Sequence, residues 1–341
     1  MSKKTMTMCA LLAAAAMALA LVGCGGQQEK YPTRDITMTV PWNPGGSTDL
    51  TGRALAEPMG KFLKTKITVV NTPGAGGSAG TMAVMKAKKD GYNILANGFL
   101  AFCSQPFMGT IKTDVKDWDF YLGTFTPNIV AVRKESPYKT FPDLLKAMKE
   151  KPGQITVGSA GPGSGGHIGI EVLKSATGIK YKHVAYGGGA PAIVATLSGE
   201  VDMNTQLLVE MQDMIKKGDI IALAAFTPED IKIPGGPTIP SITKFVPSLS
   251  AKLPMGETTG IAVPKGLPDN VLKQLDAAFA DAIKDPGFTK FCDDRGFKIL
   301  GINRGEESAK YITKLYSVVG WTLQDAGVAK VSPDTLKVPK P

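Results

Sequence analysis

The sequence has 341 residues, with 39 Lys and Arg against 30 Asp and Glu and a formal net charge of +9. The basic residues are spread thinly and lack the interleaved aromatic residues of a nucleic-acid interface, so nucleic acid is not expected as a partner. No Cys-x-x-Cys or Cys/His spacing predicts a metal site.

The N-terminal segment has the pattern of a secretory signal peptide. Two lysines precede an uncharged apolar run from Cys9 to Gly23, which is shorter than the roughly 20 residues of a membrane-spanning helix. Small residues precede Cys24, as in a bacterial lipobox. We therefore expect removal of residues 1–23 and acylation of Cys24, for example by palmitate, at the start of a linker over residues 24–33.

The expected location is extracytoplasmic, in the periplasm or on the outer face of the cell membrane, with the lipid on Cys24 holding the protein at the membrane. The alternative is an ordinary signal peptide with an incidental cysteine. Either interpretation places the mature protein outside the cytoplasm.

The mature chain of about 320 residues is longer than one hydrophobic core usually serves, so we expect two domains. Short β-type runs alternate with stretches that have an apolar residue every three or four positions, which predicts an α/β fold with largely parallel sheets. The runs are "DITMTV" (35–40), "KITVVN" (66–71), "YNILAN" (92–97), "NIVAVR" (128–133), "QITVGS" (154–159), "YKHVAY" (181–186) and "IIALAA" (220–225).

Two predicted helices have the clearest amphipathic patterns. One begins after Pro268 and the other runs from about Glu306 to Ala326. An earlier helical pattern contains Pro58, which should kink that helix or end it early. The apolar faces of the two clear helices are Val271, Leu275, Ala278, Phe279, Ala282 and Ile283 in the first, and Ile312, Leu315, Val318, Val319 and Leu323 in the second.

Glycine and proline are concentrated in three loops, each between a predicted strand and a predicted helix. The loops are "PWNPGGSTD" (41–49), "NTPGAGGSAG" (71–80) and "GSAGPGSGGH" (158–167). A strand-to-helix loop lies at the carboxyl edge of a parallel sheet, where open α/β folds bind ligands. Three such loops predict one shared site.

These loops are suited to an anion. The start of a helix exposes about four N–H groups without intrahelical acceptors, at the positive end of the helix dipole. In the first loop, Gly45 and Gly46 allow close approach to the backbone, and Ser47 or Thr48 can cap the helix. The loops contain no Lys or Arg, so N–H groups, hydroxyls and bridging water would hold the anion. The alternative is that the glycines only permit a tight turn.

Two glycine-rich segments also match enzyme motifs. "GPGSGG" (161–166) fits a dinucleotide loop, but no acid follows at the spacing needed for a ribose, and we expect no cofactor. "GGSAG" (76–80) fits a nucleophile elbow, so an exported serine-type hydrolase using Ser78 or Ser164 is the alternative function. No residue pair has the spacing of a catalytic acid and base, and we expect no enzyme.

Several residues near the loops have two interpretations. Trp42 either forms a wall of the site or packs in the core. His167 either donates to a ligand or has a local packing role, and His183 is expected to be a satisfied core histidine. Cys103 and Cys292 could form one disulfide in an exported protein or remain two buried thiols.

Longer segments resemble a known family. They are "YPTRDITMTVPWNPGGSTDLTGRALAE" (31–57), "VVNTPGAGGSAGTMAVMKAKKDGYNIL" (69–95), "GSAGPGSGGHIGIEVLKSATGIKYKHVAYGGGAPAIVATLSGEVDM" (158–203), "GPTIPSI" (236–242), "GIAVPKGLPDNVLKQL" (260–275) and "DPGFTKFCDDRGF" (285–297). Together they are similar to the tripartite tricarboxylate transporter substrate-binding family, also called Bug receptors, over nearly the whole mature chain.

The resemblance implies an α/β, two-lobed periplasmic-binding-protein fold of type II, with two mixed or parallel sheets flanked by helices and a hinge of two crossing strands. We place the crossings near residues 123–130 and 258–263. Domain 1 is expected to comprise residues 34–125 and 262–341, and domain 2 residues 126–261. The implied function is capture of a small organic carboxylate, such as a di- or tricarboxylate, for two integral membrane transporter subunits.

In this family, main-chain groups and ordered water from the first and third loops hold a ligand carboxylate. That role maps onto Gly45, Gly46, Ser47, Thr48 and Asp49, and onto Ser159, Gly163 and Ser164. Trp42, His167, Thr205 and Gln206 are further candidates for ligand binding. Relatives often have an acid where this chain has Gln206. Because a neutral amide cannot neutralise an ammonium group, we hypothesise a ligand without a free amine.

Overall fold

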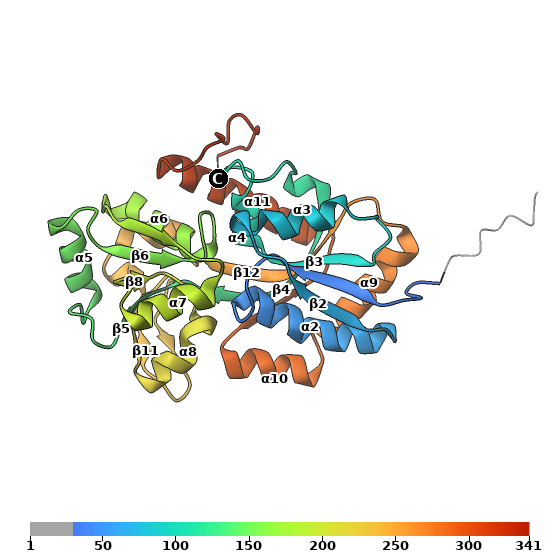
Figure 1. The fold of residues 1–341 in the computed structure, drawn as a ribbon, viewed down its shortest axis with the longest axis horizontal. Helices are drawn as coiled ribbons and strands as arrows, with labels where there is room; N and C mark the ends of the chain where they lie inside the picture. Colours follow the sequence, from blue (N-terminus) through green and yellow to red (C-terminus); the bar gives the residue numbers. More distant parts are fainter. Residues whose placement is uncertain (1–29, 341) are drawn as a thin grey trace, which may run out of the picture. The chain divides into compact units, whose positions relative to one another are not determined.

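Two β-sheets organise the chain from Pro32 onward in the computed structural model (Figure 1). The structure describes residues 30–340. The predicted signal peptide, the acylation site Cys24 and most of the linker lie outside the described residues. Among the residues described, no helix combines the length and the apolar character needed to cross a membrane.

The first sheet has six strands in the order β13-β4-β12-β3-β1-β2. Strands β1, β2 and β3 are parallel, whereas β12 runs antiparallel to both β3 and β4. The strands are β1 (Ile36–Val40), β2 (Ile67–Asn71), β3 (Asn93–Gly98), β4 (Trp118–Pro127), β12 (Gly256–Pro264) and β13 (Lys298–Ile302).

Helices cover both faces of the first sheet (Figure 1). One face carries α2 (Ser47–Leu63), α9 (Asp269–Ala282) and α10 (Pro286–Arg295). The other carries α3 (Ser78–Lys86), α4 (Phe99–Ser104) and α11 (Glu306–Asp325).

The second sheet has five strands in the order β7-β6-β8-β5-β9. β6 is parallel to β7 and β8, and β5 is antiparallel to β8 and β9. The strands are β5 (Ile129–Arg133), β6 (Thr156–Ser159), β7 (Lys182–Ala185), β8 (Met203–Asn204) and β9 (Ile220–Ala225), and the helices of this lobe are α5 (Phe141–Glu150), α6 (Gly165–Thr177), α7 (Gly189–Ser198) and α8 (Leu208–Lys217). A short hairpin of β10 (Ile231–Lys232) and β11 (Thr238–Ile239) follows β9.

The chain crosses between the two sheets twice, and the crossings are hydrogen-bonded to each other. It leaves the first sheet at Asn128, between β4 and β5, and returns through Met255 into β12. The N–H of Asn128 donates to the Met255 carbonyl at 3.1 Å, and that of Met255 donates to the Phe226 carbonyl at 3.0 Å. The first crossing falls within the expected range 123–130. The second precedes 258–263, because those residues already belong to β12.

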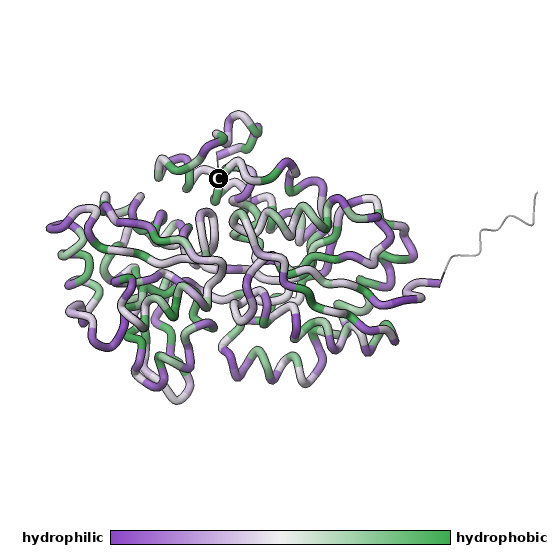
Figure 2. Tube along the Cα trace, in the orientation of Figure 1, coloured by the Kyte–Doolittle hydropathy of each residue, from purple (hydrophilic) through white to green (hydrophobic). Residues whose placement is uncertain are grey.

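The two-lobed α/β fold is therefore confirmed, and all seven predicted strands are present. The expected domain boundaries stay a prediction. The predicted apolar faces explain the packing, since Val271, Leu275 and Phe279 of α9 and Ile312 and Val319 of α11 are buried. Figure 2 shows hydrophobic residues alternating with hydrophilic ones along the chain in both lobes.

Two local expectations have clear outcomes. Helix α2 continues through Pro58 to Leu63, so the prediction of an early end was wrong. Proline removes one backbone hydrogen bond, but Leu55, Met59 and Leu63 of this helix are buried on both sides of it. Cys103 and Cys292 are both buried and free, which is the second of the two alternatives for these thiols.

Candidate functional site

A cavity lies between the two lobes, where α2 of one lobe meets α6, α7 and α8 of the other at their N-terminal ends. The cavity has a volume of about 30 Å³. Its lining is Trp42, Gly46, Ser47, Thr48, Ala160, Ser164, Gly165, Gly166, Gly189, Gln206, Leu207 and Glu210. The first and third glycine loops thus share one site. The second loop does not line it, so the expectation that all three loops share one site was wrong for the second.

The first loop ends in an unusual helix cap. Gly46 is the N-cap residue of α2, and no side chain of the loop caps this helix. Instead, the Ser47 N–H donates to Oε1 of Glu210, on α8 of the other lobe, at 2.8 Å. The expectation that Ser47 or Thr48 caps the helix was therefore wrong, because the helix begins at Ser47 and a carboxylate from the opposite lobe takes the capping position.

Asp49 holds the first loop in shape. Its carboxylate accepts hydrogen bonds from the Gly45 N–H at 2.9 Å, from Arg53 Nε at 3.0 Å and from Asn71 Nδ2 at 2.9 Å. Burial opposes ionisation of Asp49, but these hydrogen bonds outweigh it and lower its pKa. The contact with Asp49 also orders Gly45, whose φ of +91° favours glycine.

Trp42 packs in the core and also forms part of the cavity wall, so the two alternatives for this residue are not exclusive. Its side chain is 7% exposed, its Nε1 donates to Asn97 Oδ1 at 3.0 Å, and it also lines the cavity. The indole packs against Gly77 of the second glycine loop, where a Cβ atom would lie 2.8 Å from the ring. The second loop therefore supports a wall of the cavity from behind.

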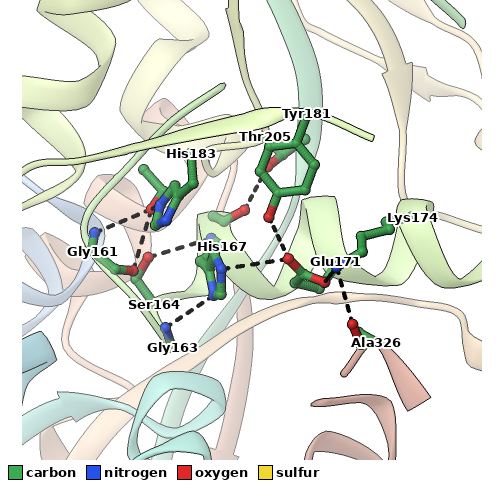
Figure 3. Close-up of polar contacts among 12 residues, drawn as sticks. Gly161, Gly163, Ser164, His167, Glu171, Lys174, Tyr181, His183, Thr205 and Ala326 are labelled. Atoms are coloured by element: carbon green, nitrogen blue, oxygen red, sulfur yellow. Dashed lines mark hydrogen bonds and ion pairs between the residues drawn. The ribbon is translucent and has the colours of Figure 1, made fainter. Parts of the chain in front are cut away.

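Two histidines order the third loop (Figure 3). His167 Nδ1 accepts from the Gly163 N–H at 3.1 Å, and His183 Nε2 lies 2.6 Å from Ser159 Oγ. The two rings lie against each other with centroids 4.5 Å apart. Ser164 is the N-cap of α6, and its Oγ accepts from the His167 N–H at 3.3 Å. Ser164 lines the cavity together with Ala160, Gly165 and Gly166 of the same loop, whereas Ser159, Gly163 and His167 are not part of the lining.

The protonation state of His167 follows from its surroundings. Burial, with a smaller contribution from His183, lowers its pKa to about 3. Because Nδ1 accepts a hydrogen bond, the proton is on Nε2, which lies 3.6 Å from Glu171 Oε1. Glu171 also accepts from Tyr181 and from Lys174 (Figure 3). This network fixes the loop and gives His167 a positioning role.

Thr205 and Gln206 complete the sequence-predicted set. Thr205 Oγ1 donates to the Gly166 carbonyl at 2.5 Å and holds the first turn of α6. Gln206 is 2% exposed, lines the cavity and lies against Gly166, where a Cβ atom would be 2.8 Å from its Cδ. Trp42, Gly46, Ser47, Thr48, Ser164 and Gln206 line the cavity, while Gly45, Asp49, Ser159, Gly163, His167 and Thr205 lie around it.

Sequence reasoning missed Glu210, the acid of the cavity wall. Burial raises its pKa to about 7, although the hydrogen bond from the Ser47 N–H acts in the opposite direction. Glu210 lies in the first turn of α8, which follows the end of β8. An acid at the start of a helix that follows a strand was the sequence pattern that could have identified it. The family pattern directs attention to Gln206, which precedes α8, and not to Glu210 within it.

The serines named for a hydrolase have other partners. Ser78 Oγ donates to Thr110 Oγ1 at 2.7 Å, and the Ser164 hydroxyl caps α6. Within residues 30–340 no group of three or more His, Cys, Asp or Glu side chains is arranged to hold a metal ion.

Comparison with known proteins gives a consistent result. The family model described as tripartite tricarboxylate transporter family receptor matches residues 51–325. The BugT protein of Bordetella pertussis is 27% identical over 289 residues, which cover 82% of this chain and 86% of BugT. Two solved structures share the fold. The periplasmic binding protein BugD is 26% identical, with a TM-score of 0.79, and the match covers 88% of this chain and 99% of BugD. MatC of Rhodopseudomonas palustris with bound malate is 23% identical, with a TM-score of 0.78, and the match covers 86% of this chain and 100% of MatC.

Proposed function

Because the chain belongs to the tripartite tricarboxylate transporter receptor family, we propose that it captures a small organic carboxylate outside the cytoplasm and delivers it to two integral membrane transporter subunits. In this proposal the lipid on Cys24 anchors the protein to the membrane. Receptors of this family are solute-binding proteins rather than enzymes, so the hydrolase alternative is not pursued.

One observation carries the proposal of an anionic ligand. Two loops that lack Lys and Arg line one cavity between the lobes; Glu210 already accepts from the start of α2, and the first turn of α6 also lines the cavity. Helix N-termini bind carboxylates through unsatisfied N–H groups and the positive end of the dipole. The malate bound to MatC supports this ligand class. The residues proposed to contact the ligand are Trp42, Gly46, Ser47, Thr48, Ser164 and Gln206, with Gly45, Asp49, Ser159, Gly163, His167 and Thr205 holding the loops around it.

Ligand-induced thermal stabilisation tests the proposed function. The mature protein would be heated with a panel of mono-, di- and tricarboxylates, and each acid that raises the melting temperature would then be titrated by calorimetry. A receptor leaves its ligand chemically unchanged. If no carboxylate stabilises the protein, or if the acid is consumed, the proposed function is wrong.

Gly46→Val provides a structural test of the same site. A Cβ on Gly46 would lie 3.1 Å from Glu210 Oε1, and the backbone φ of −80° allows a side chain there. We expect loss of carboxylate binding with an unchanged circular dichroism spectrum, because the added bulk fills the space in front of the α2 N-terminus. Normal binding by this variant would place the ligand elsewhere.

The anchor is tested separately. Replacing Cys24 with Ala should abolish incorporation of labelled palmitate and release the protein from the membrane fraction, while the purified domain still binds its ligand. Membrane association that survives this change would contradict the anchor and leave carboxylate binding intact.

A further inference from the structure

The cavity has one side that can donate hydrogen bonds to a ligand. Gly165 and Gly166, the first residues of α6, line the cavity. First-turn N–H groups have no intrahelical acceptor, and the helix dipole is positive there. Ser164 Oγ takes the next N–H, that of His167. The start of α6 is therefore the side of the cavity that is suited to a ligand carboxylate.

The opposite side presents an acceptor. The carboxylate of Glu210 already accepts the Ser47 N–H at the start of α2, so it neutralises the positive end of that helix. Gly189 leaves no room for a side chain next to this carboxylate, and Gly46 lies against it without a side chain to shield it. Glu210 is thus held in place by the protein and forms part of the cavity wall.

Charge then limits what can lie next to Glu210. It is the only ionisable side chain in the cavity lining among the residues described, and no Lys, Arg or His accompanies it. Glu257, a second buried acid, lies behind Gly165, where a Cβ atom would be 3.1 Å from its Oε2. When Glu210 is ionised, above its pKa of about 7, a ligand carboxylate against it would meet like charge in a medium of low dielectric constant. A hydrogen-bond donor would not.

Unsatisfied polar atoms point the same way. Within residues 30–340, no hydrogen-bond partner is found for the buried Glu210 Oε2 or for Gln206 Nε2. Both side chains line the cavity. A buried polar atom without a partner is costly, so a ligand that offers a donor to the carboxylate and an acceptor to the amide would remove both costs.

We propose that Glu210 is a specificity-determining residue that accepts a hydrogen bond from a hydroxyl or ammonium group of the ligand. The protein would then select carboxylates that carry such a donor next to the carboxylate, namely 2-hydroxy or 2-amino acids. This inference rests on the proposed function. It replaces the expectation of a ligand without an amine, which was based on Gln206 alone, because Glu210 in the first turn of α8 brings an acid to the same cavity.

Matched acids test the inference. Calorimetric titration would compare three sets in which only the 2-substituent changes: succinate, malate and aspartate; glutarate, 2-hydroxyglutarate and glutamate; propanoate, lactate and alanine. In at least one set, we expect the hydroxy or amino acid to bind about 10- to 100-fold more tightly than the unsubstituted acid, as a hydrogen bond to a charged group allows. The better of the two identifies the donor as hydroxyl or ammonium.

Glu210→Gln isolates the side chain. The amide can still accept the Ser47 N–H but lacks the charge, so the preference should shrink to within about threefold. Asp213→Asn is the matched control, because it removes an exposed acid of the same helix, 3.5 Å from Arg295. The control should keep the wild-type preference. Circular dichroism and the melting temperature establish that both variants are folded.

The outcomes separate the two proposals. If substituted and unsubstituted acids bind equally well, or if Glu210→Gln keeps the full preference, the role of Glu210 is refuted while the carboxylate receptor stands. If none of the acids and no other carboxylate binds, the proposed function itself is refuted.

Discussion

Replacing Glu257 with Gln should make the folded protein less sensitive to alkaline pH. Glu257 lies on β12, is 3% exposed and accepts the Leu100 N–H at 2.6 Å at the start of α4. Burial raises its pKa to about 8, and the nearby Glu210 adds to the rise, whereas the hydrogen bonds from Leu100 and Ala101 oppose it. Glutamine has the shape of the protonated acid but cannot ionise.

The sign and size follow from linkage. The folded protein keeps a proton on Glu257 that the unfolded chain releases above an ordinary pKa near 4.5, so stability falls as pH rises from there to about 8. The slope is about 1.4 kcal/mol per pH unit, so Glu257 costs about 3 kcal/mol between pH 6 and pH 9. With an unfolding entropy of roughly 0.65 kcal/mol/K for about 310 residues, this is about 4 °C in Tm. Glu210, with a pKa of about 7, contributes about half as much.

The assay is thermal unfolding at pH 6, 7.5 and 9. Glu257→Gln should be more stable than the wild type already at pH 6, and its advantage in Tm should widen by about 4 °C between pH 6 and pH 9. Glu229→Gln, which changes an exposed acid, should follow the wild type throughout. If the wild type and Glu257→Gln lose stability in parallel, Glu257 is ionised at no cost in the fold and the reasoning from burial fails.

Two further predictions concern the loops. Asp49→Ala should lower the free energy of unfolding by about 2–3 kcal/mol in urea titrations, because three hydrogen bonds to the carboxylate are lost; a change below about 0.5 kcal/mol would contradict this role. His167 should remain neutral at pH 5, since its pKa is about 3, and ¹⁵N shifts of the imidazole should report the Nε2–H tautomer; imidazolium shifts at that pH would refute the assignment.

The sequence was most informative where one period or one local rule decides the structure. Alternating apolar runs located seven strands, and the apolar faces after Pro268 and Glu306 located α9 and α11. The first and third glycine loops located the cavity, because each follows a strand at the carboxyl edge of its own sheet and both loops line the cavity between the lobes. Strand β13, with its partly exposed "KILGI", lacks a clear period-2 pattern, and sequence reasoning missed it.

Long-range partners could not be predicted in the same way. The cap of α2 comes from Glu210, 163 residues further along the chain, so no local capping rule could find it. The continuation of α2 through Pro58 depends on burial of neighbouring residues in the sheet interface, which also exceeds a local rule. Tertiary packing decided both features.

Two loop glycines, Gly76 and Gly187, lie where the two lobes approach each other. A Cβ on Gly76 would lie 2.8 Å from the Pro162 carbonyl oxygen, and one on Gly187 would lie 2.6 Å from Asn43 Nδ2. Each of these glycines faces a residue of the opposite lobe, so its missing side chain sets how near the halves approach. Mutational scans of these positions should therefore report the spacing between the halves as well as recognition, and tolerance at Gly187 should depend on the size of the side chain at position 43.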